Sequence, residues 1–197
     1  MSTSWLTETP LTSDLVTLMP LRKEHAKGLV EAASDGELWN LWFTSVPSAE
    51  TVDSYIEKAL QQQKEGTSLP FVIIDNASQT IIGCTRICNA IEQHKRVEIG
   101  YTWYAKRVQR TAVNSQCKLL LLQLAFETLG CIAVEFKTHW HNVKSRAAIA
   151  RLGAKQDAVL RNHQIGIDGI IRDTVIFSII QSEWPAVKQS LSFKINN

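Results

Sequence analysis

Two helix-forming segments in the middle of the chain have the same boundary residues, and this repetition constrains the fold more than any other feature. Asn114 and Asn142 precede these segments, and Gly130 and Gly153 follow them. Asparagine favours the N-cap of a helix, and glycine favours the left-handed residue after the last turn. The helices are expected over 115–129 and 143–152, each directly after a strand-like segment, 96–105 and 133–139. Helices that alternate with strands in this way pack against a sheet.

The remaining segments complete a mixed pattern of strands and helices. Pro20 near the end of the first strand indicates a sheet edge, and Ser48 is the expected N-cap of the second helix. A turn-forming cluster at 75–79 separates two of the strands, as in an antiparallel meander. The expected strands are 15–22, 69–75, 80–88 and 172–180, and the expected helices are 23–33 and 48–66. The sequence therefore predicts an α/β (α+β) fold, with a mixed sheet flanked by helices on both faces.

Length and composition indicate an ordinary globular protein. The 197 residues suit a single domain over 1–197, and the net charge of +2 gives no support for a nucleic-acid partner. The first fourteen residues are polar, and no apolar run approaches the ~18–20 residues of a membrane span. We therefore expect a cytoplasmic protein. The four cysteines form no metal-binding pattern, so reduced, buried thiols and no metal are expected.

The segment before the 115–129 helix has the features of an anion-binding helix start. A helix N-terminus carries unpaired N–H groups and a partial positive charge. Gln109, Arg110 and Thr111 add donors just before it. The same residues are also consistent with simple capping, and the sequence alone leaves both interpretations open.

Alternation places the residues of strand 96–105 in two sets. Val97, Ile99, Tyr101 and Trp103 are expected on one face, with Glu98, Gly100, Thr102 and Tyr104 on the other. Glycine within a strand indicates either a bulge, which would free backbone groups for an extended ligand, or close packing.

Two further groups of residues are candidates for chemistry. Glu135, Lys137 and His139 share one face of strand 133–139, where they could transfer protons or simply face solvent. The aromatic segment 35–47 contains Trp39, Trp42 and Phe43, which could line an acceptor cleft or belong to the core. Asp35 and Glu37 in the same segment could attract a cationic amine.

Five segments together resemble the GNAT superfamily of acyl-CoA-dependent N-acyltransferases. Within it, the chain is most similar to the branch that contains the ribosomal-protein alanine N-acetyltransferases. The resemblance covers nearly the whole chain. It is carried by LTSDLVTLMPLRKEHA, EIGYTWYA, KLLLLQLAFETLG, VEFKTHWHNVKSRAAIARLGAK and GIIRDTVIFSIIQSEWP.

The resemblance implies how acetyl-CoA would bind. The family's pyrophosphate loop, Gln/Arg-x-x-Gly-x-Gly/Ala, corresponds here to Gln109, Arg110, Thr111, Ala112, Val113 and Asn114. Ala112 and Asn114 replace small, glycine-like residues, which bears on cofactor affinity. The strand residues Tyr101, Thr102, Trp103 and Tyr104 would run beside the pantetheine arm, and one backbone N–H there would polarise the acetyl carbonyl. Asn142 would contact pantetheine.

The resemblance also implies direct transfer of the acetyl group to a primary amine. Ser145 would lie near the thioester sulfur. Many family members carry on this helix a tyrosine that acts as the acid for the leaving thiolate; Ile149 occupies that stretch here, and Ser145 would take the role. Glu135 is the first candidate for the base and His139 the second. Trp39, Trp42, Phe43 and the segment 160–169 would shape the acceptor site.

The acceptor itself is left open between a protein or peptide N-terminus and a small-molecule amine, as is a homodimer. A catalytically silent acyl-CoA-binding or sensing module is the main alternative. A translation-associated binding protein is a further alternative, by analogy only.

Overall fold

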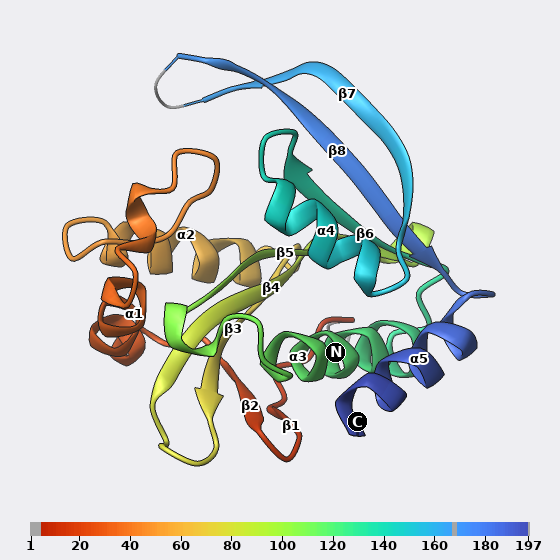
Figure 1. Ribbon diagram of the computed structural model, residues 1–197, viewed down its shortest axis with the longest axis horizontal. Coiled ribbons are helices and arrows are strands. Elements are labelled where there is room, and N and C mark those ends of the chain that lie inside the picture. The colour runs from red at the N-terminus through yellow and green to blue at the C-terminus, as the bar shows by residue number, and fades with distance from the viewer. Residues whose placement is uncertain (1–4, 167–168, 197) are drawn as a thin grey trace.

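A single eight-stranded sheet organises the computed structural model, which describes residues 5–166 and 169–196 (Figure 1). The strands lie in the order β1-β2-β3-β4-β5-β6-β8-β7. Their bounds are β1 Leu11–Thr12, β2 Val16–Pro20, β3 Leu69–Asp75, β4 Ile81–Ile91, β5 Arg96–Tyr104, β6 Ala133–His139, β7 Lys155–Ile165 and β8 Ile171–Ile180. Neighbouring strands are antiparallel except β5 and β6, which are parallel. The predicted mixed, mostly antiparallel sheet is confirmed.

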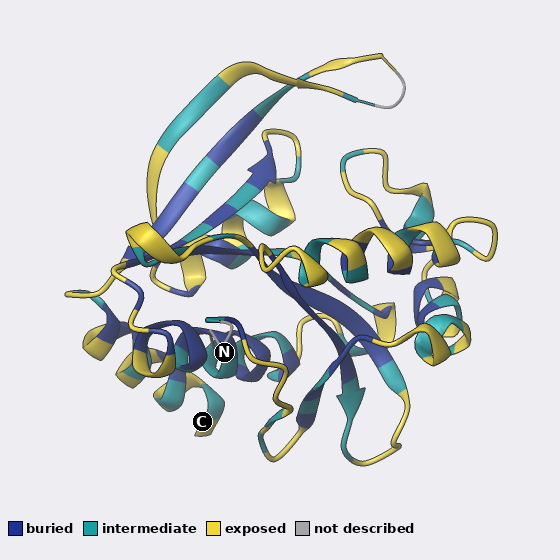
Figure 2. Cartoon of the chain, turned by 180° about the vertical axis from the view of Figure 1, so that it is seen from behind, coloured by how far each residue is buried: buried dark blue, intermediate teal, exposed yellow. Residues whose placement is uncertain are grey.

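Helices cover both faces of the sheet. The helices α1 (Ala26–Ser34) and α2 (Val52–Lys64) pack on one face, with Leu29, Ile56 and Trp103 in their apolar cluster. The other three helices are α3 (Val113–Gln123), α4 (Val143–Arg151) and α5 (Trp184–Asn196). They pack on the opposite face and share a larger cluster that includes Leu121, Phe136 and Trp184. The structure therefore has two apolar cores separated by the sheet, and both sides of β4 are buried (Figure 2).

The cap chemistry predicts the ends of helices better than their starts. Gly130 and Gly153 have positive φ values of 65° and 103° directly after helical segments, as predicted. The side chain of Asn142 accepts a hydrogen bond from the N–H of Ser145, so this predicted N-cap is confirmed. The predicted N-cap roles of Ser48 and Asn114 are wrong. Helix α2 begins four residues after Ser48, with Thr51 at its N-cap, and Asn114 lies inside the first turn of α3.

The last quarter of the chain contains two elements that the sequence pattern did not reveal. Strand β7 carries mostly exposed residues, so it lacks the apolar alternation by which strands are recognised. Helix α5 buries only Trp184, Val187 and Leu191. Figures 1 and 2 show that β7 and β8 form a long hairpin that rises away from the body of the protein and is exposed toward its tip.

Pro20 has no partner strand on the β1 side of β2. Strand β2 is second in the sheet, not at its edge, but β1 is only two residues long and pairs with Thr17 and Leu18. The pairing therefore ends before Pro20, whose missing N–H is tolerated there.

The four cysteines are free and buried, as predicted. Among the described residues, no helix is long and apolar enough to cross a bilayer.

We predict that Gly83 is required for the close approach of β4 and β5. A Cβ at this position would lie 2.3 Å from the carbonyl oxygen of Trp103, which is backbone and cannot move aside. Gly83→Ala should therefore lower the free energy of unfolding by about 3 kcal/mol, or the Tm by roughly 6–12 °C.

Gly66→Ala provides the comparison, because an added Cβ there meets no atom within 4 Å although φ is 73°. It should cost about 1 kcal/mol. Thermal unfolding that ranks Gly66→Ala as the more damaging change would contradict this account of the β4–β5 contact.

Candidate active site

The sheet opens between its two parallel strands. Strands β5 and β6 pair at only three positions, which end at Glu98 and Glu135. Beyond these residues, β5 stays with β4, whereas β6 continues along β8. Figure 1 shows the two strands diverging from this point. The backbone groups of β5 on the side of β6 therefore lose their partner strand after Glu98.

A bulge in β5 lies at the opening. Arg86 pairs with Gly100 and Cys84 pairs with Trp103, so one residue of β4 stands opposite two residues of β5. Tyr101 within the bulge has a φ of 51°, which is unusual for a bulky residue. The extra residue reverses the alternation that follows it.

The predicted facing of strand β5 is therefore wrong beyond the bulge. Val97 and Ile99 belong to the cluster of α3, whereas Trp103 belongs to that of α2. The interpretation of Gly100 as the mark of a bulge is correct.

An arginine supports the bulge from the face covered by α2. Arg86 is only 1% exposed, and its guanidinium lies 4.3 Å from the ring centre of Tyr101 and 4.6 Å from that of Tyr55. The sandwich between two rings stabilises the buried cation. No salt bridge joins Arg86 to an acidic side chain in residues 5–166 and 169–196.

A lysine approaches the bulge from the opposite face. The Nζ of Lys118 on α3 donates to the Oγ1 of Thr102 at 2.7 Å, and the residue Lys118 as a whole is 5% exposed. The Thr102 hydroxyl also contacts Thr85 at 2.8 Å and donates to the carbonyl of Gly100 at 3.3 Å. Burial lowers the pKa of Lys118 to about 8.

A row of ion pairs lies where the pairing of β5 and β6 ends. The Nζ of Lys137 lies 3.0 Å from Glu98 and 3.1 Å from Glu135, and Arg96 also pairs with Glu135. Burial alone would raise the pKa of Glu135, but the hydrogen bonds from Arg96 and Lys137 outweigh it and lower the pKa. Glu135 is therefore a weak proton acceptor in this structure.

His139 ends strand β6 beside two aromatic rings. Its ring centre lies 4.8 Å from that of Trp42 and 5.6 Å from that of His141. The Nδ1 of His139 accepts the backbone N–H of His141 at 3.0 Å, which places the proton of the neutral ring on Nε2. Burial lowers the pKa of His139, with further lowering by the charges of Arg172 and His141. The ring is therefore neutral near pH 7 and can accept a proton only at Nδ1.

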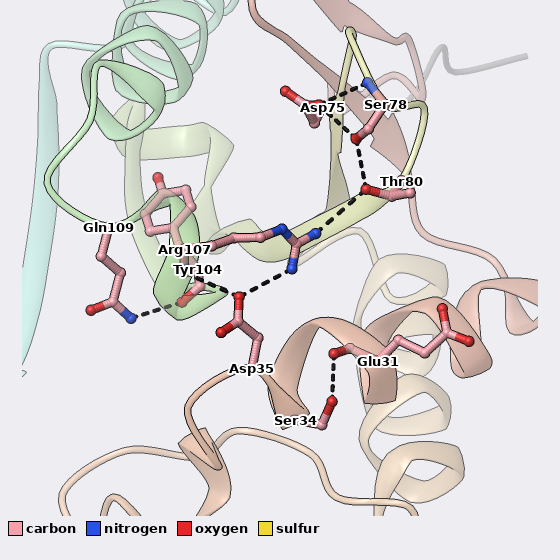
Figure 3. Close-up of polar contacts among 9 residues, drawn as sticks. All are labelled: Glu31, Ser34, Asp35, Asp75, Ser78, Thr80, Tyr104, Arg107 and Gln109. Atoms are coloured by element: carbon pink, nitrogen blue, oxygen red, sulfur yellow. Dashed lines mark hydrogen bonds and ion pairs between the residues drawn. The ribbon is translucent and has the colours of Figure 1, made fainter.

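The loop before α3 is fixed to the body of the protein by a small polar network (Figure 3). Arg107 donates from its backbone N–H and its guanidinium to Asp35, at 3.0 and 3.1 Å. Gln109 donates to the carbonyl of Tyr104 at 2.9 Å. The hydrogen bond from the Arg107 backbone holds the pKa of Asp35 below its usual value. Asp35 thus holds this loop, instead of facing a cationic amine.

The start of α3 presents backbone N–H groups without a side-chain cap. Ala112 is the N-cap residue and makes no capping hydrogen bond, while Thr111 bonds to Val108 and to the N–H of Val113. The one positive φ in this loop belongs to Arg110, at 65°, and Ala112 has a φ of −68°. Alanine therefore fits its position without strain.

The start of α4 is held by its own cap. Asn142 receives the N–H of Ser145 at 3.1 Å, and both residues are half-buried. Ile149 is buried in the core one turn further on. Of Ser145 and Ile149, only Ser145 carries a hydroxyl that could contact a ligand at the start of α4.

The aromatic segment divides between two places. Trp42 is 60% exposed and contacts His139, with Phe43 5.6 Å from it. Trp39 instead lines a hollow of about 420 Å³ between the end of α1 and the start of α2. Their role in binding an acceptor therefore stays a prediction.

Three cations near the opening were not identified from the sequence. They are Arg86, Lys118 and Arg172. Arg86 and Lys118 stand alone within apolar segments, TIIGCTRIC and CKLLLL, and this isolation is the signal that could have found them. The neighbours of Arg172 depend on the pairing of β8 with β6, which sequence alone does not reveal.

A mixed sheet that opens between two parallel strands beside a bulge is compatible with an acyl-CoA-dependent acyltransferase. The family model described as an acetyltransferase (GNAT) domain matches residues 16–155. The chain therefore belongs to the GNAT acetyltransferase family, and its similarity to that family is confirmed.

Similar proteins agree with this assignment. A GCN5-related N-acetyltransferase from Brucella melitensis is 28% identical, with a TM-score of 0.87 over 96% of this chain and 86% of that one. YdaF from Bacillus subtilis (strain 168), provisionally named a ribosomal N-acetyltransferase, is 28% identical over 55% of this chain and 58% of its own length. RimJ from Mycobacterium smegmatis, solved with CoA-disulfide, shares the fold, with 21% identity and a TM-score of 0.77 over 94% and 93% of the two chains.

We predict that the imidazole of His139 is still mostly neutral just below pH 6.5, the pH at which an ordinary histidine is half protonated. Its folded pKa is depressed, so acidification below pH 6.5 protonates the unfolded chain first and lowers stability. Arg172→Gln should raise the pKa of His139, as followed by NMR of the imidazole ring.

Lys155→Gln is the matched control, because Lys155 is on the same hairpin, about 20 Å along the strand from Arg172. An unchanged titration of His139 in Arg172→Gln would refute this coupling.

Proposed function

We propose that the protein transfers an acetyl group from acetyl-CoA to a primary amine, the N-terminus of a protein or peptide. The observation that carries this proposal is the opening of β5 from β6 beside the bulge at Tyr101 and Thr102. Within a family of acetyltransferases, such an opening accommodates an extended, amide-containing arm that pairs with the free edge of β5.

The cofactor would lie along three elements. Its pyrophosphate would bind the N–H groups at the start of α3, from Gln109 to Asn114, where the helix dipole favours negative charge. Its pantetheine arm would follow the backbone from Tyr101 to Tyr104 and contact Asn142. RimJ, with the same fold, has been solved with a CoA derivative, which supports this choice of cofactor.

The transfer would proceed by direct attack. A neutral amine attacks the thioester carbonyl, a backbone N–H of the bulge stabilises the oxyanion, and the C–S bond then breaks. Ser145 would lie beside the sulfur. Of the two candidate bases, the surroundings favour His139, because Glu135 already binds two cations. His139 would take the proton at Nδ1 after this atom releases the N–H of His141.

Exposed apolar side chains on the β7–β8 hairpin and at Trp42 favour a protein or peptide acceptor over a small amine. The β7–β8 hairpin extends beyond the body and exposes Ile165 and Ile171, while Trp42 is exposed next to His139. The name of YdaF refers to a ribosomal acetyltransferase, which is consistent with a protein acceptor. A polypeptide could use the hairpin and Trp42 together, whereas a small amine could not.

The proposal is tested by a screen of amines with acetyl-CoA. The purified protein should release CoA thiol in proportion to added peptide, and blocking the peptide's α-amine should abolish the release. Panels should include peptides with varied first residues, polyamines and free amino acids. Binding of CoA without transfer to any amine would instead favour the catalytically silent module. Absence of CoA binding would overturn both functions.

We predict that Asn114→Asp weakens CoA binding about tenfold, which corresponds to ~1.4 kcal/mol. The new carboxylate would repel the pyrophosphate, yet an acidic residue in the first turn does not disfavour the helix itself. Calorimetric titration should therefore show a higher Kd with an unchanged or higher Tm. Asn114→Ser, which is neutral, should bind CoA like the parent. Equal affinities for all three proteins would contradict the assignment of the phosphate site.

A further inference from the structure

Lys118 is a buried amine that has no role in the function proposed above. It lies in the second turn of α3, and its Nζ donates to Thr102 at 2.7 Å. No salt bridge joins it to an acidic side chain in residues 5–166 and 169–196. A buried ammonium without a counter-charge costs free energy, and replacement by an apolar side chain would remove that cost.

The titratable groups that interact electrostatically with Lys118 do not neutralise it. They are Cys117 on its own helix and Cys88 on β4. Burial raises the pKa of each thiol to about 12, so both stay protonated near neutral pH. Beyond Cys88, Glu98 is already paired with Lys137. In the described part of the chain, the ammonium is therefore paired with no carboxylate.

Thr102 connects Lys118 to the opening. It is one of the two bulge residues, on the segment of β5 that has left β6, and it is half-buried, whereas Lys118 is buried. Its hydroxyl accepts from Lys118 and donates its one proton to the carbonyl of Gly100 at 3.3 Å, a long bond that a bound ligand could replace. A group bound along this edge of β5 would therefore meet the hydroxyl first and the ammonium through it.

We propose that the Lys118–Thr102 pair supplies the proton to the CoA thiolate that leaves during acetyl transfer. This inference rests on the proposed function. As the C–S bond breaks, its electron pair stays on sulfur, and the Thr102 hydroxyl gives sulfur its proton. Lys118 replaces that proton on Thr102, becomes a neutral amine, and regains a proton from solvent. The proton lost by the acceptor amine leaves through the base, so the products are the amide and CoA thiol.

The acidity of the pair matches this task better than that of Ser145. A thiolate near the reference pKa of about 8.5 takes a proton readily from an ammonium of pKa about 8. A serine hydroxyl is a far weaker acid than a thiol, so Ser145 suits a hydrogen bond to sulfur and not its protonation. Lys118 would thus act through Thr102 as a positioning and proton-supplying residue, and Thr102 would touch the sulfur.

The test compares Lys118→Met and Lys118→Arg with the parent in single-turnover transfer from acetyl-CoA to a peptide amine. Methionine removes the charge at similar volume, and arginine keeps the charge but does not release a proton. Both variants should transfer about 100-fold more slowly at pH 7, with the Kd for CoA within threefold of the parent. The parent rate should fall above about pH 8, and this descending limb should be absent in Lys118→Met.

Two further proteins make the result specific. Lys144→Met makes the same substitution at an exposed lysine beside Ser145 and should match the parent in rate and pH profile. Thr102→Val should reproduce the loss seen in Lys118→Met. NMR of lysine Cε in the parent should also show one residue titrating near pH 8 that is missing in Lys118→Met.

The outcomes separate the two proposals. A parent that releases no thiol with any amine would overturn the proposed function and this inference with it. An active parent whose rate is kept within twofold by Lys118→Met would overturn this inference alone. A loss confined to CoA affinity, or a descending limb that persists in Lys118→Met, would also overturn it.

Discussion

The parallel pairing between β5 and β6 ends after three residue pairs, and the arrangement of the site depends on this early end. Parallel strands normally stay paired because their hydrogen bonds would otherwise be lost. Here β6 keeps β8 as a partner and β5 keeps β4, so each strand loses only one side of its ladder. The unpaired edge of β5 is thereby available to an amide-bearing ligand, without any loop having to enter the interior.

The bulge in β5 is bracketed by two buried cations, one from each face of the sheet. Arg86 lies under Tyr101 on the side of α2, and Lys118 reaches Thr102 from α3. Neither has an acidic partner in the described part of the chain, although burying an unpaired charge is costly. Acetyl transfer develops negative charge first on the carbonyl oxygen and then on the sulfur. Two preorganised cations around that point would stabilise both charges, which gives a physical reason for keeping them in the core.

The parts of the fold that the sequence predicts are those set by local chemistry. The glycines after α4 and after the 115–129 segment adopt left-handed angles, and Asn142 caps its helix, because these preferences need no distant partner. The facing of Trp103 could not be predicted, since Gly100 suggests a bulge but does not show how many residues it inserts. Strand β7 was missed because its exposure on a projecting hairpin removes the apolar alternation. The same limit applies to the site, where Lys118 and Arg86 are visible as isolated charges but their contacts arise only from the packing of α3 and α2.

The phosphate site proposed for the loop before α3 would be built without glycine. Glycine is needed where φ is positive or where a Cβ would collide with the ligand. In this loop the positive φ falls on Arg110, which is exposed, whereas Ala112 has an ordinary negative φ. The loop is fixed from behind by Asp35 through Arg107 and by the bond from Gln109 to Tyr104. These hydrogen bonds hold the loop in place. The proposed anion binding would use the N–H groups of α3, which do not depend on side-chain identity.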